Sequence, residues 1–331
     1  MQVIGIVAEY NPLHSGHLYH IAQSRAAVGE ESRIICFMSG NWVQRGDAAI
    51  LDKWARAEMA LSCGADLVLE LPLPWAVSSA RRFAEGAVAA MEAAGVVNRI
   101  SFGSEAGELS GLNRVAGCLL TPEYEQALRL ELGKGISFAA ARQRAVYSCI
   151  GEEASLLDTP NNILSVAYLC ALQKSGSDIR PMTILRQGAG HDQPAEPGQC
   201  PSAAALRSLL LRDEKPPSGW MPEAVWEIWN RNKELGKAPA RLIYCERALL
   251  SRLRTMSGEE YESLPDSGEG LANRLMRAAR TQTSLEEILS AAKTKRYAEA
   301  RLRRMLIWAF LGMDRRVLQS EPAYLRVLGF N

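Results

Sequence analysis

Short apolar runs alternate with stretches of helical periodicity through the first third of the chain. Runs long enough for one buried strand each lie at residues 3–8, 33–38, 66–71 and 99–102. Helical spacing fills the segments between and after them, at residues 17–28, 48–63 and 77–95. This alternation predicts an α/β fold, with a parallel sheet and helices on both of its faces. Ligands of such sheets bind at the carboxyl ends of the strands.

The first apolar run leads through a tight turn into a helix. Pro12 breaks the strand, and Gly16 supplies backbone freedom at the turn. His14, His17 and His20, three of the four histidines, lie around the helix start. Free N–H groups and the helix dipole favour an anion at such a position. We interpret this segment as a nucleotide-phosphate site; the alternative is that these are ordinary polar residues around a turn.

Two arginines are further candidates for holding phosphate; the alternative is that they are ordinary surface residues. Arg186 follows an apolar run at 182–185, and Arg207 lies in a helix that Ser202 caps. A guanidinium group can bind phosphate through two parallel hydrogen bonds, which an ammonium group cannot do. Between the two arginines, residues 187–201 contain three Gly and three Pro, so we expect a mobile loop over the site.

Charge is distributed unevenly along the chain. The net charge is only +1, yet from residue 271 onward twelve Lys and Arg stand against five Asp and Glu. Only helical patterns follow a charged, Pro-rich linker at 212–219. We therefore expect a catalytic domain at 1–214 and a helical, basic domain at 215–331 that docks a polyanion. The alternative is a helix with a solvated basic face.

Composition favours the cytoplasm and gives no sign of a membrane partner. The seven cysteines are scattered and form no Cys-x-x-Cys pair, as is usual for reduced thiols in cytoplasmic proteins. No apolar run reaches the ~18 residues of a membrane span, and Met1 leads directly into a strand rather than a signal peptide. We expect no metal site built by the protein itself.

Several motifs resemble those of a known family. His14-Ser15-Gly16-His17 resembles the His-x-Gly-His signature of the nucleotidylyltransferase superfamily, and the longer string 8–18 resembles the opening of the bacterial tRNA(Met) cytidine acetate ligases. Further segments that agree, in order, are 38–46, 52–60, 102–105, 160–164 and 293–297. The resemblance implies a Rossmann-like catalytic domain followed by an all-helical domain that binds tRNA.

The resemblance also implies which residues form the site. Catalytic roles fall to His14, His17, Arg186 and Arg207, which would surround the phosphates of ATP. The ATP-binding residues would be Val7, Ala8, Glu9, Tyr10, Asn11, Pro12, Leu13, His14, Ser15, Gly16, His17, Leu18, Tyr19, His20, Gly103, Asn161, Asn162 and Arg186. The tRNA-binding residues would be Lys293, Lys295, Arg296, Tyr297, Arg301 and Arg304, with Tyr297 as a stacking face.

The family activity implied is a ligation in two steps. ATP, with Mg²⁺, would convert acetate to acetyl-adenylate with release of pyrophosphate. The N4 amine of the wobble cytidine of elongator tRNA(Met) would then take the acetyl group, giving N4-acetylcytidine and AMP. The alternatives are nucleotidyl transfer onto a small phosphorylated acceptor, and an RNA-binding protein that keeps the ATP fold as a relic.

Weaker candidates and departures from the family pattern complete the expectations. Lys53, Gln44 and Arg45 could bind phosphate or the tRNA end of the reaction, and Glu9 or Glu105 could act as an acid–base or metal carboxylate. Ala204 stands where the pattern has a second hydroxyl, and residues 188–192 lack the expected aromatic residue before His-Asp. Because the family pattern continues past Asn331, we expect the tRNA-binding domain to be incomplete at its C-terminus.

Overall fold

A six-stranded sheet forms the centre of the computed structural model, which describes residues 1–187, 200–294 and 297–331. The strand order is β7-β6-β1-β2-β5-β8. The strands are β1 (Val3–Ala8), β2 (Arg33–Ser39), β5 (Leu67–Leu71), β6 (Arg99–Ser104), β7 (Arg180–Leu185) and β8 (Arg326–Phe330). All neighbours pair in parallel except β8, which runs antiparallel to β5. The predicted parallel sheet is therefore confirmed.

The order of the strands fixes where a ligand can bind. From β1 the chain steps through β2 to β5 on one side, and it then returns to place β6 and β7 on the other side of β1. The strand order therefore reverses between β1 and β6. In open α/β sheets a crevice opens at this point, outside the carboxyl ends of the strands.

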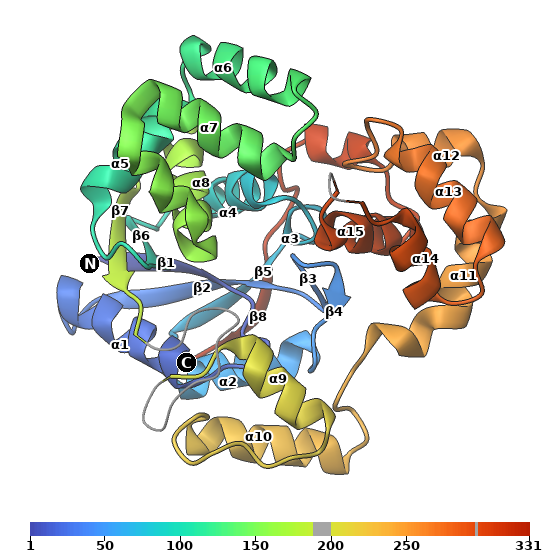
Figure 1. Ribbon diagram of the computed structural model, residues 1–331. Helices are drawn as coiled ribbons and strands as arrows, with labels where there is room; N and C mark the ends of the chain where they lie inside the picture. Colours follow the sequence, from blue (N-terminus) through green and yellow to red (C-terminus); the bar gives the residue numbers. More distant parts are fainter. Residues whose placement is uncertain (188–199, 295–296) are drawn as a thin grey trace.

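Both faces of the sheet are buried, which explains why the strands read as unbroken apolar runs. Alternate residues of β2 point into different cores: Ile35 and Phe37 into one, Ile34 and Cys36 into the other. The first core is covered by α4 (Ala80–Ala94), α5 (Leu109–Leu119) and α8 (Pro160–Ser175), with α3 (Leu73–Ala76), α6 (Pro122–Gly133), α7 (Phe138–Ile150) and the 3₁₀ helix η1 (Gly151–Asp158) nearby. The second is covered by α1 (Ser15–Val28), α2 (Lys53–Ser62), α9 (Ala203–Leu211) and α10 (Glu223–Glu234) (Figure 1).

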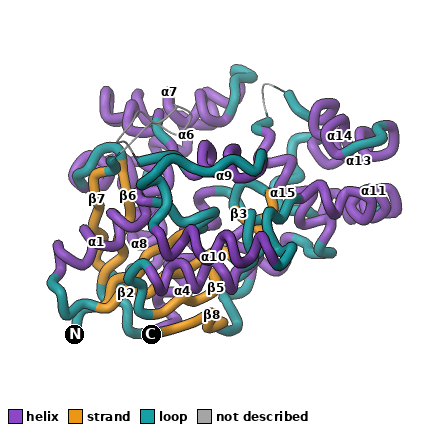
Figure 2. The backbone as a smooth tube through the Cα atoms, turned by 90° about the horizontal axis from the view of Figure 1, so that it is seen from below, coloured by secondary structure: helices purple, strands orange, loops and turns teal. Residues whose placement is uncertain are grey.

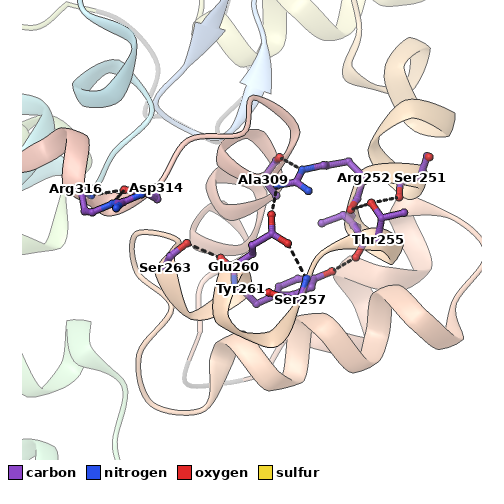
Figure 3. A network of polar contacts seen from close by, with 11 residues as sticks. Ser251, Arg252, Thr255, Ser257, Glu260, Tyr261, Ser263, Ala309, Asp314 and Arg316 are labelled. Atoms are coloured by element: carbon purple, nitrogen blue, oxygen red, sulfur yellow. Dashed lines mark hydrogen bonds and ion pairs between the residues drawn. The ribbon is translucent and has the colours of Figure 1, made fainter.

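The remaining helices form a third core of their own. They are η2 (Leu242–Cys245), α11 (Glu246–Thr255), α12 (Gly258–Ser263), α13 (Leu271–Thr281), α14 (Leu285–Ala292), α15 (Glu299–Phe310) and η3 (Arg315–Gln319). Figure 2 shows α11, α13 and α14 gathered at one end of the molecule, away from β7. In this group Arg252 ties the helix ends together, donating to Ala309 O at 3.3 Å and pairing with Glu260 at 2.7 Å (Figure 3). We call η2 to α15 the helical module.

Two local expectations are corrected by the structure. The helix expected at 48–63 begins only at Lys53, because the Asp52 side chain caps it by accepting the N–H of Ala55 at 2.8 Å. The residues before it belong to a small hairpin of β3 (Trp42–Val43) and β4 (Asp47–Ala48). The C-terminal part is not all helical, because β8 returns to the edge of the main sheet.

The second core of the sheet contains residues from both sides of the expected domain boundary at 214/215. Helix α10 lies beyond residue 214, yet Val225 and Trp229 of α10 belong to the second core of the sheet.

All seven cysteines are free thiols. Within the residues that the structure describes, no helix is long and apolar enough to cross a membrane.

Candidate functional site

A cavity of about 220 Å³ lies at the point where the strand order reverses. Its walls come from the end of β1, the start of α1, the end of β6 and the first turns of α8, with further residues from α4, α9 and the segments after β3 and β7. The lining residues include Ala8, Glu9, Tyr10, Asn11, His17, His20, Gln44, Phe102, Gly103, Asn161, Ser165, Tyr168, Arg186 and Arg207. The motifs that follow the strands in sequence therefore do meet at one edge of the sheet.

The turn after β1 is held rigidly in an unusual backbone shape. Tyr10 has a positive φ of 44°, and the Asn11–Pro12 peptide bond is cis. The Tyr10 hydroxyl lies 3.3 Å from Cys36 Sγ in the core, and Asn11 Oδ1 accepts the N–H of Ile50 at 2.8 Å. These contacts direct the chain sharply from β1 into α1 and hold the imidazoles that follow.

His14 and His17 cap the start of α1 together. Gly16 N–H donates to His14 Nδ1 at 3.1 Å, and His14 N–H donates to His17 Nδ1 at 3.2 Å. The two ring centroids are 3.7 Å apart. His17 lines the cavity, whereas His14 is buried behind it. The expected pair of imidazoles is thus brought together, with only the second one facing the cavity directly.

All three imidazoles of this segment favour the neutral form. Burial, together with the nearby Arg186 guanidinium, lowers the pKa of His14 to about 3 and that of His20 to about 4, and Arg207 adds to the effect on His14. Burial likewise lowers the pKa of His17 well below its usual value, and His14 and Arg186 add to the effect. At neutral pH these rings therefore act as hydrogen-bond donors and acceptors without a charge.

Both predicted arginines line the same cavity. Arg186 follows β7, and its backbone N–H donates to Ser104 O at 3.0 Å, which places it beside Gly103 at the end of β6. Arg207 of α9 donates to Asn11 O at 2.8 Å. Burial lowers the pKa of Arg207, although not enough to discharge a guanidinium at neutral pH. Two cations thus line the cavity, and the Arg207 side chain is held there by the Asn11 carbonyl.

The two asparagines at the start of α8 have different positions. Asn161 lines the cavity and donates through Nδ2 to Glu105 Oε1 at 2.6 Å. Asn162 is buried, and its Oδ1 accepts the N–H of Ala106 at 3.1 Å. In contrast to the expectation for Asn162, its side chain holds the loop after β6 and does not line the cavity.

Glu105 also serves the loop rather than the cavity. Its Oε2 accepts the N–H of Asn162 at 2.8 Å. Burial raises the pKa of Glu105, but the hydrogen bonds from Asn161, Thr159 and the backbone outweigh it and leave the pKa below its usual value. Glu105 is therefore an ionised anchor for the start of α8, which does not suit it to proton transfer.

The segment expected to bind ATP meets the cavity through only some of its residues. Those that line it are Val7, Ala8, Glu9, Tyr10, Asn11, His17 and His20. Those that do not are Pro12, Leu13, His14, Ser15, Gly16, Leu18 and Tyr19. Leu13 is fully buried in the core, while the Leu18 side chain faces solvent. These residues shape the turn and the helix rather than the cavity wall.

Arg56 is a buried cation that the sequence analysis did not single out. It is inaccessible to solvent and donates to the backbone carbonyls of Leu51 (3.1 Å), Glu9 (2.6 Å), Ser39 (3.0 Å) and Gly40. Burial lowers its pKa to about 10, so it stays charged at neutral pH. Arg56 therefore joins the carboxyl ends of β1 and β2 beneath the cavity.

The expected tRNA-binding residues are mostly engaged within the helical module. The Tyr297 ring is buried and its hydroxyl donates to Glu269 O at 2.7 Å, so the ring is not exposed for stacking, in contrast to the expectation. Arg301 donates twice to Asp266 O, and Arg304 pairs with Asp266 at 3.2 Å. Lys293 is exposed and pairs with Glu299 at 2.9 Å.

Some of the expected site residues are not described by the structure, and others do not line the cavity. Lys295, Arg296 and the glycine-rich loop at 188–192 lie outside the described residues. Ser202 caps α9 by accepting the N–H of Ala205 at 3.1 Å, as expected. Lys53 pairs with Glu70 at 2.7 Å and does not line the cavity.

A Rossmann-like parallel sheet with a His-x-Gly-His turn and two arginines around one cavity defines a nucleotidyltransferase. In agreement, a family model described as HIGH Nucleotidyl Transferase matches residues 1–331. The tRNA(Met) cytidine acetate ligase of Caldanaerobacter subterraneus is 40% identical over 338 residues, covering all of this chain and 84% of that protein. That of Syntrophomonas wolfei is also 40% identical, over 345 residues and 82% of its length.

Solved structures agree with the sequence comparison. The apo crystal structure of Thermotoga maritima TmcAL has a TM-score of 0.93 at 38% identity, covering all of this chain and 81% of that one. The same protein bound with alpha-thio ATP has a TM-score of 0.90 at 37% identity and 80% coverage. The chain belongs to the tRNA(Met) cytidine acetate ligase family.

Proposed function

We propose that this protein activates acetate with ATP as acetyl-adenylate and transfers the acetyl group to N4 of the wobble cytidine of elongator tRNA(Met). The cavity is the observation that supports this proposal most directly. His17 lines it from α1, while Arg186 and Arg207 line it from other elements. Fixed donors that surround one small space are what a crowded anionic transition state requires.

The first step would need little covalent help from the protein. An acetate oxygen attacks the α-phosphorus of ATP, and pyrophosphate leaves with the electrons of the broken P–O bond. Negative charge builds up on the phosphate oxygens meanwhile, and preorganised donors lower its energy. In this role His17 offers a neutral N–H, and the two arginines offer positive charge. Gly103 and Asn161 would lie along the adenosine.

The second step would bring RNA to the same cavity. The N4 amine attacks the activated carbonyl, and AMP leaves. Nine Lys and Arg stand against three Asp and Glu at residues 271–310, which supports this part of the helical module as the tRNA-binding part, with exposed Lys293 among its contacts. Tyr297, Arg301 and Arg304 would contribute by holding the module together. Enclosure of the reacting groups by the bound base would keep water from hydrolysing the adenylate.

Magnesium would enter with the nucleotide. Among the described residues, no three His, Cys, Asp or Glu side chains lie close enough to hold a metal ion. These residues therefore do not build a cation site of their own, and we assign no step to a protein-held metal. A hard cation such as Mg²⁺ is usually carried by the phosphate oxygens of ATP with several waters.

The cytoplasm is the compartment that fits this proposal. The substrates ATP and tRNA meet there, and the seven cysteines are free thiols.

Acetate-dependent exchange of labelled pyrophosphate into ATP tests the first step, and labelled acetate incorporated into tRNA tests the second. We expect exchange without tRNA and incorporation only into a tRNA that carries a wobble cytidine. Exchange without acetate, but with a phosphorylated acceptor, would favour nucleotidyl transfer instead. Absence of any turnover would favour an RNA-binding protein that has lost catalysis.

A further inference from the structure

The cavity is lined from two sides of β1. On the side of β6, Gly103 and Asn161 form the wall that we assign to the nucleotide. On the side of β2, the wall consists of Glu9 at the end of β1 and Gln44 in the loop after β3. This second wall has no role in the first reaction step as described above.

Glu9 and Gln44 are joined in a way that fixes a carboxylate at the cavity. The backbone N–H of Gln44 donates to Glu9 Oε1 at 2.8 Å. The other carboxylate oxygen, Oε2, forms no hydrogen bond with a residue that the structure describes. The Gln44 side-chain nitrogen Nε2 is buried and likewise has no partner among the described residues. Since an unpaired buried donor is costly, a ligand that accepts a hydrogen bond here would relieve that cost.

The helical module holds Gln44 in place. Arg304 of α15 donates to Gln44 O at 3.4 Å and pairs with Asp266 at 3.2 Å. Gly46, two residues after Gln44, has φ of 75° and is pressed against the backbone of Arg304, where a Cβ would overlap the Arg304 nitrogen. Figure 1 shows this hairpin between the sheet and α15. The position of Gln44 therefore depends on the module that we propose binds tRNA.

We propose that Glu9 and Gln44 form the subsite for the acceptor base, a cytosine, and that Arg304 positions them from the helical module. Cytosine presents an N4 amine that donates, next to N3 and O2 atoms that accept. A carboxylate accepts from the amine, and an amide N–H donates to the ring acceptors. Uracil has a carbonyl oxygen where cytosine has the amine, so the carboxylate would repel it. This inference rests on the proposed function, which supplies cytosine as the acceptor.

Acetyl transfer at this subsite needs one base and one leaving group, which Glu9 and AMP supply. The N4 nitrogen forms a bond to the acetyl carbon, and the bond from that carbon to the phosphate oxygen breaks. AMP leaves with the electron pair of that bond. The amine loses one proton, which Glu9 accepts through Oε2 and then releases to water. A positioned general base of this kind contributes about 10² to 10⁴ in rate.

Comparison of the two half-reactions in variants tests the assignment. The ratio of single-turnover acetyl transfer to acetate-dependent pyrophosphate exchange separates the acceptor subsite from the nucleotide site. We expect this ratio to fall about 10²-fold or more in Glu9→Gln and at least about 10-fold in Gln44→Leu. An unchanged ratio in both variants would overturn the proposal, whether or not the overall activity falls.

Separate substitutions test whether Arg304 positions Gln44. In Arg304→Met the ratio of transfer to exchange should fall about 10-fold, and Arg304→Lys, which can still donate to Gln44 O, should restore part of it. Arg303→Met is the matched control, because Arg303 lies next in the same helix but pairs with Glu299 at 2.9 Å. Equal ratios for the Arg304→Met and Arg303→Met variants would contradict the positioning role.

A binding measurement tests the preference of the subsite for cytosine independently of catalysis. Wild-type protein should bind an anticodon stem-loop with cytosine at the target position about 10-fold more tightly than one with uracil, and Gln44→Leu should lose this preference. Equal affinity for the two stem-loops in the wild type would overturn the inference. If the wild type prefers cytosine but shows no acetate-dependent reaction, the proposed function fails and the subsite stands.

Discussion

The backbone N–H of His14 fixes where the His17 ring carries its proton, and that of Gly16 does the same for His14. His17 Nδ1 accepts the backbone N–H of His14 at 3.2 Å, while His14 Nδ1 accepts from Gly16 at 3.1 Å. Because a backbone N–H can only donate, both Nδ1 atoms must carry a lone pair. Both rings are neutral, so the single proton of each sits on Nε2. The helix cap thereby converts His17 into a fixed N–H donor at the cavity.

Two substitutions at His17 separate the capping role of Nδ1 from the hydrogen-bond donor role of Nε2. In His17→Asn the amide oxygen can replace Nδ1, but nothing replaces the Nε2 donor. We expect pyrophosphate exchange to fall about 10² to 10³-fold, with less than about 1 kcal/mol lost in unfolding free energy. His17→Gln places an amide near Nε2 and should retain more activity at a greater loss of stability. Exchange rates and urea unfolding measure both, and the reverse ranking would refute the argument.

The buried imidazoles make the protein sensitive to acid. The folded pKa of His14, lowered to about 3 mainly by burial, lies below the value of about 6.5 in an unfolded chain. Between these values the unfolded state binds more protons, so stability is fully present above about pH 6.5 and is lost as the pH falls. The expected slope is about 1.4 kcal/mol per pH unit for each such imidazole.

Urea unfolding between about pH 7 and about pH 5 checks this slope. In His14→Asn the amide oxygen can still accept the N–H of Gly16, but the titrating group is gone. We therefore expect the variant to lose stability less steeply than the wild type over this range. If the unfolding free energy of the two proteins falls equally with pH, His14 is not the group that makes the protein sensitive to acid.

Removal of Arg56 should cost more than removal of an exposed arginine. Arg56→Met leaves buried carbonyls without donors, among them that of Glu9, and we expect a loss of about 3 kcal/mol or more in unfolding free energy. Arg231→Met removes an exposed ion pair with Glu58 and should change stability by less than about 0.5 kcal/mol. Chemical denaturation of both variants measures the difference, and similar losses would count against the structural role of Arg56.

Two glycines within helices should respond to alanine in opposite ways. Gly86 in α4 is packed against Trp75, and a Cβ there would overlap the indole ring. Gly86→Ala should therefore destabilise the protein by about 1–3 kcal/mol despite the better helix propensity of alanine. Gly117 in α5 has open space around its Cβ position, so Gly117→Ala should stabilise by up to about 1 kcal/mol. Thermal melting measures both, and shifts in the same direction would contradict the packing argument.

The sheet and the position of the cavity could be predicted because local patterns determine them. The strand predicted at residues 3–8 is β1, and the strands predicted at 33–38, 66–71 and 99–102 differ from the observed ones by at most two residues at an end. A run buried on both faces has to be apolar throughout, which makes it visible in sequence. The polar residues after such runs then meet at the carboxyl edge of the sheet.

The features that were missed depend on contacts distant in sequence. Arg56 looks like any helical arginine until the fold brings four carbonyls around it. Strand β8 is short, and only its pairing with β5 reveals it. Tyr297 follows a basic run and therefore looked exposed, but its hydroxyl reaches Glu269, which is 28 residues earlier in the chain. In each case the partner, rather than the residue itself, decides the role.

The pairing of β8 with β5 attaches the helical module to the sheet at both of its ends. The chain leaves the catalytic half after α10, passes through η2 to α15, and returns as an edge strand of the same sheet. Between these ends, Gly46 is packed against the backbone of Arg304, and Trp308 Nε1 donates to Val77 O at 2.6 Å, so the module is also held at its middle. An RNA held on these helices would therefore keep one orientation relative to the cavity.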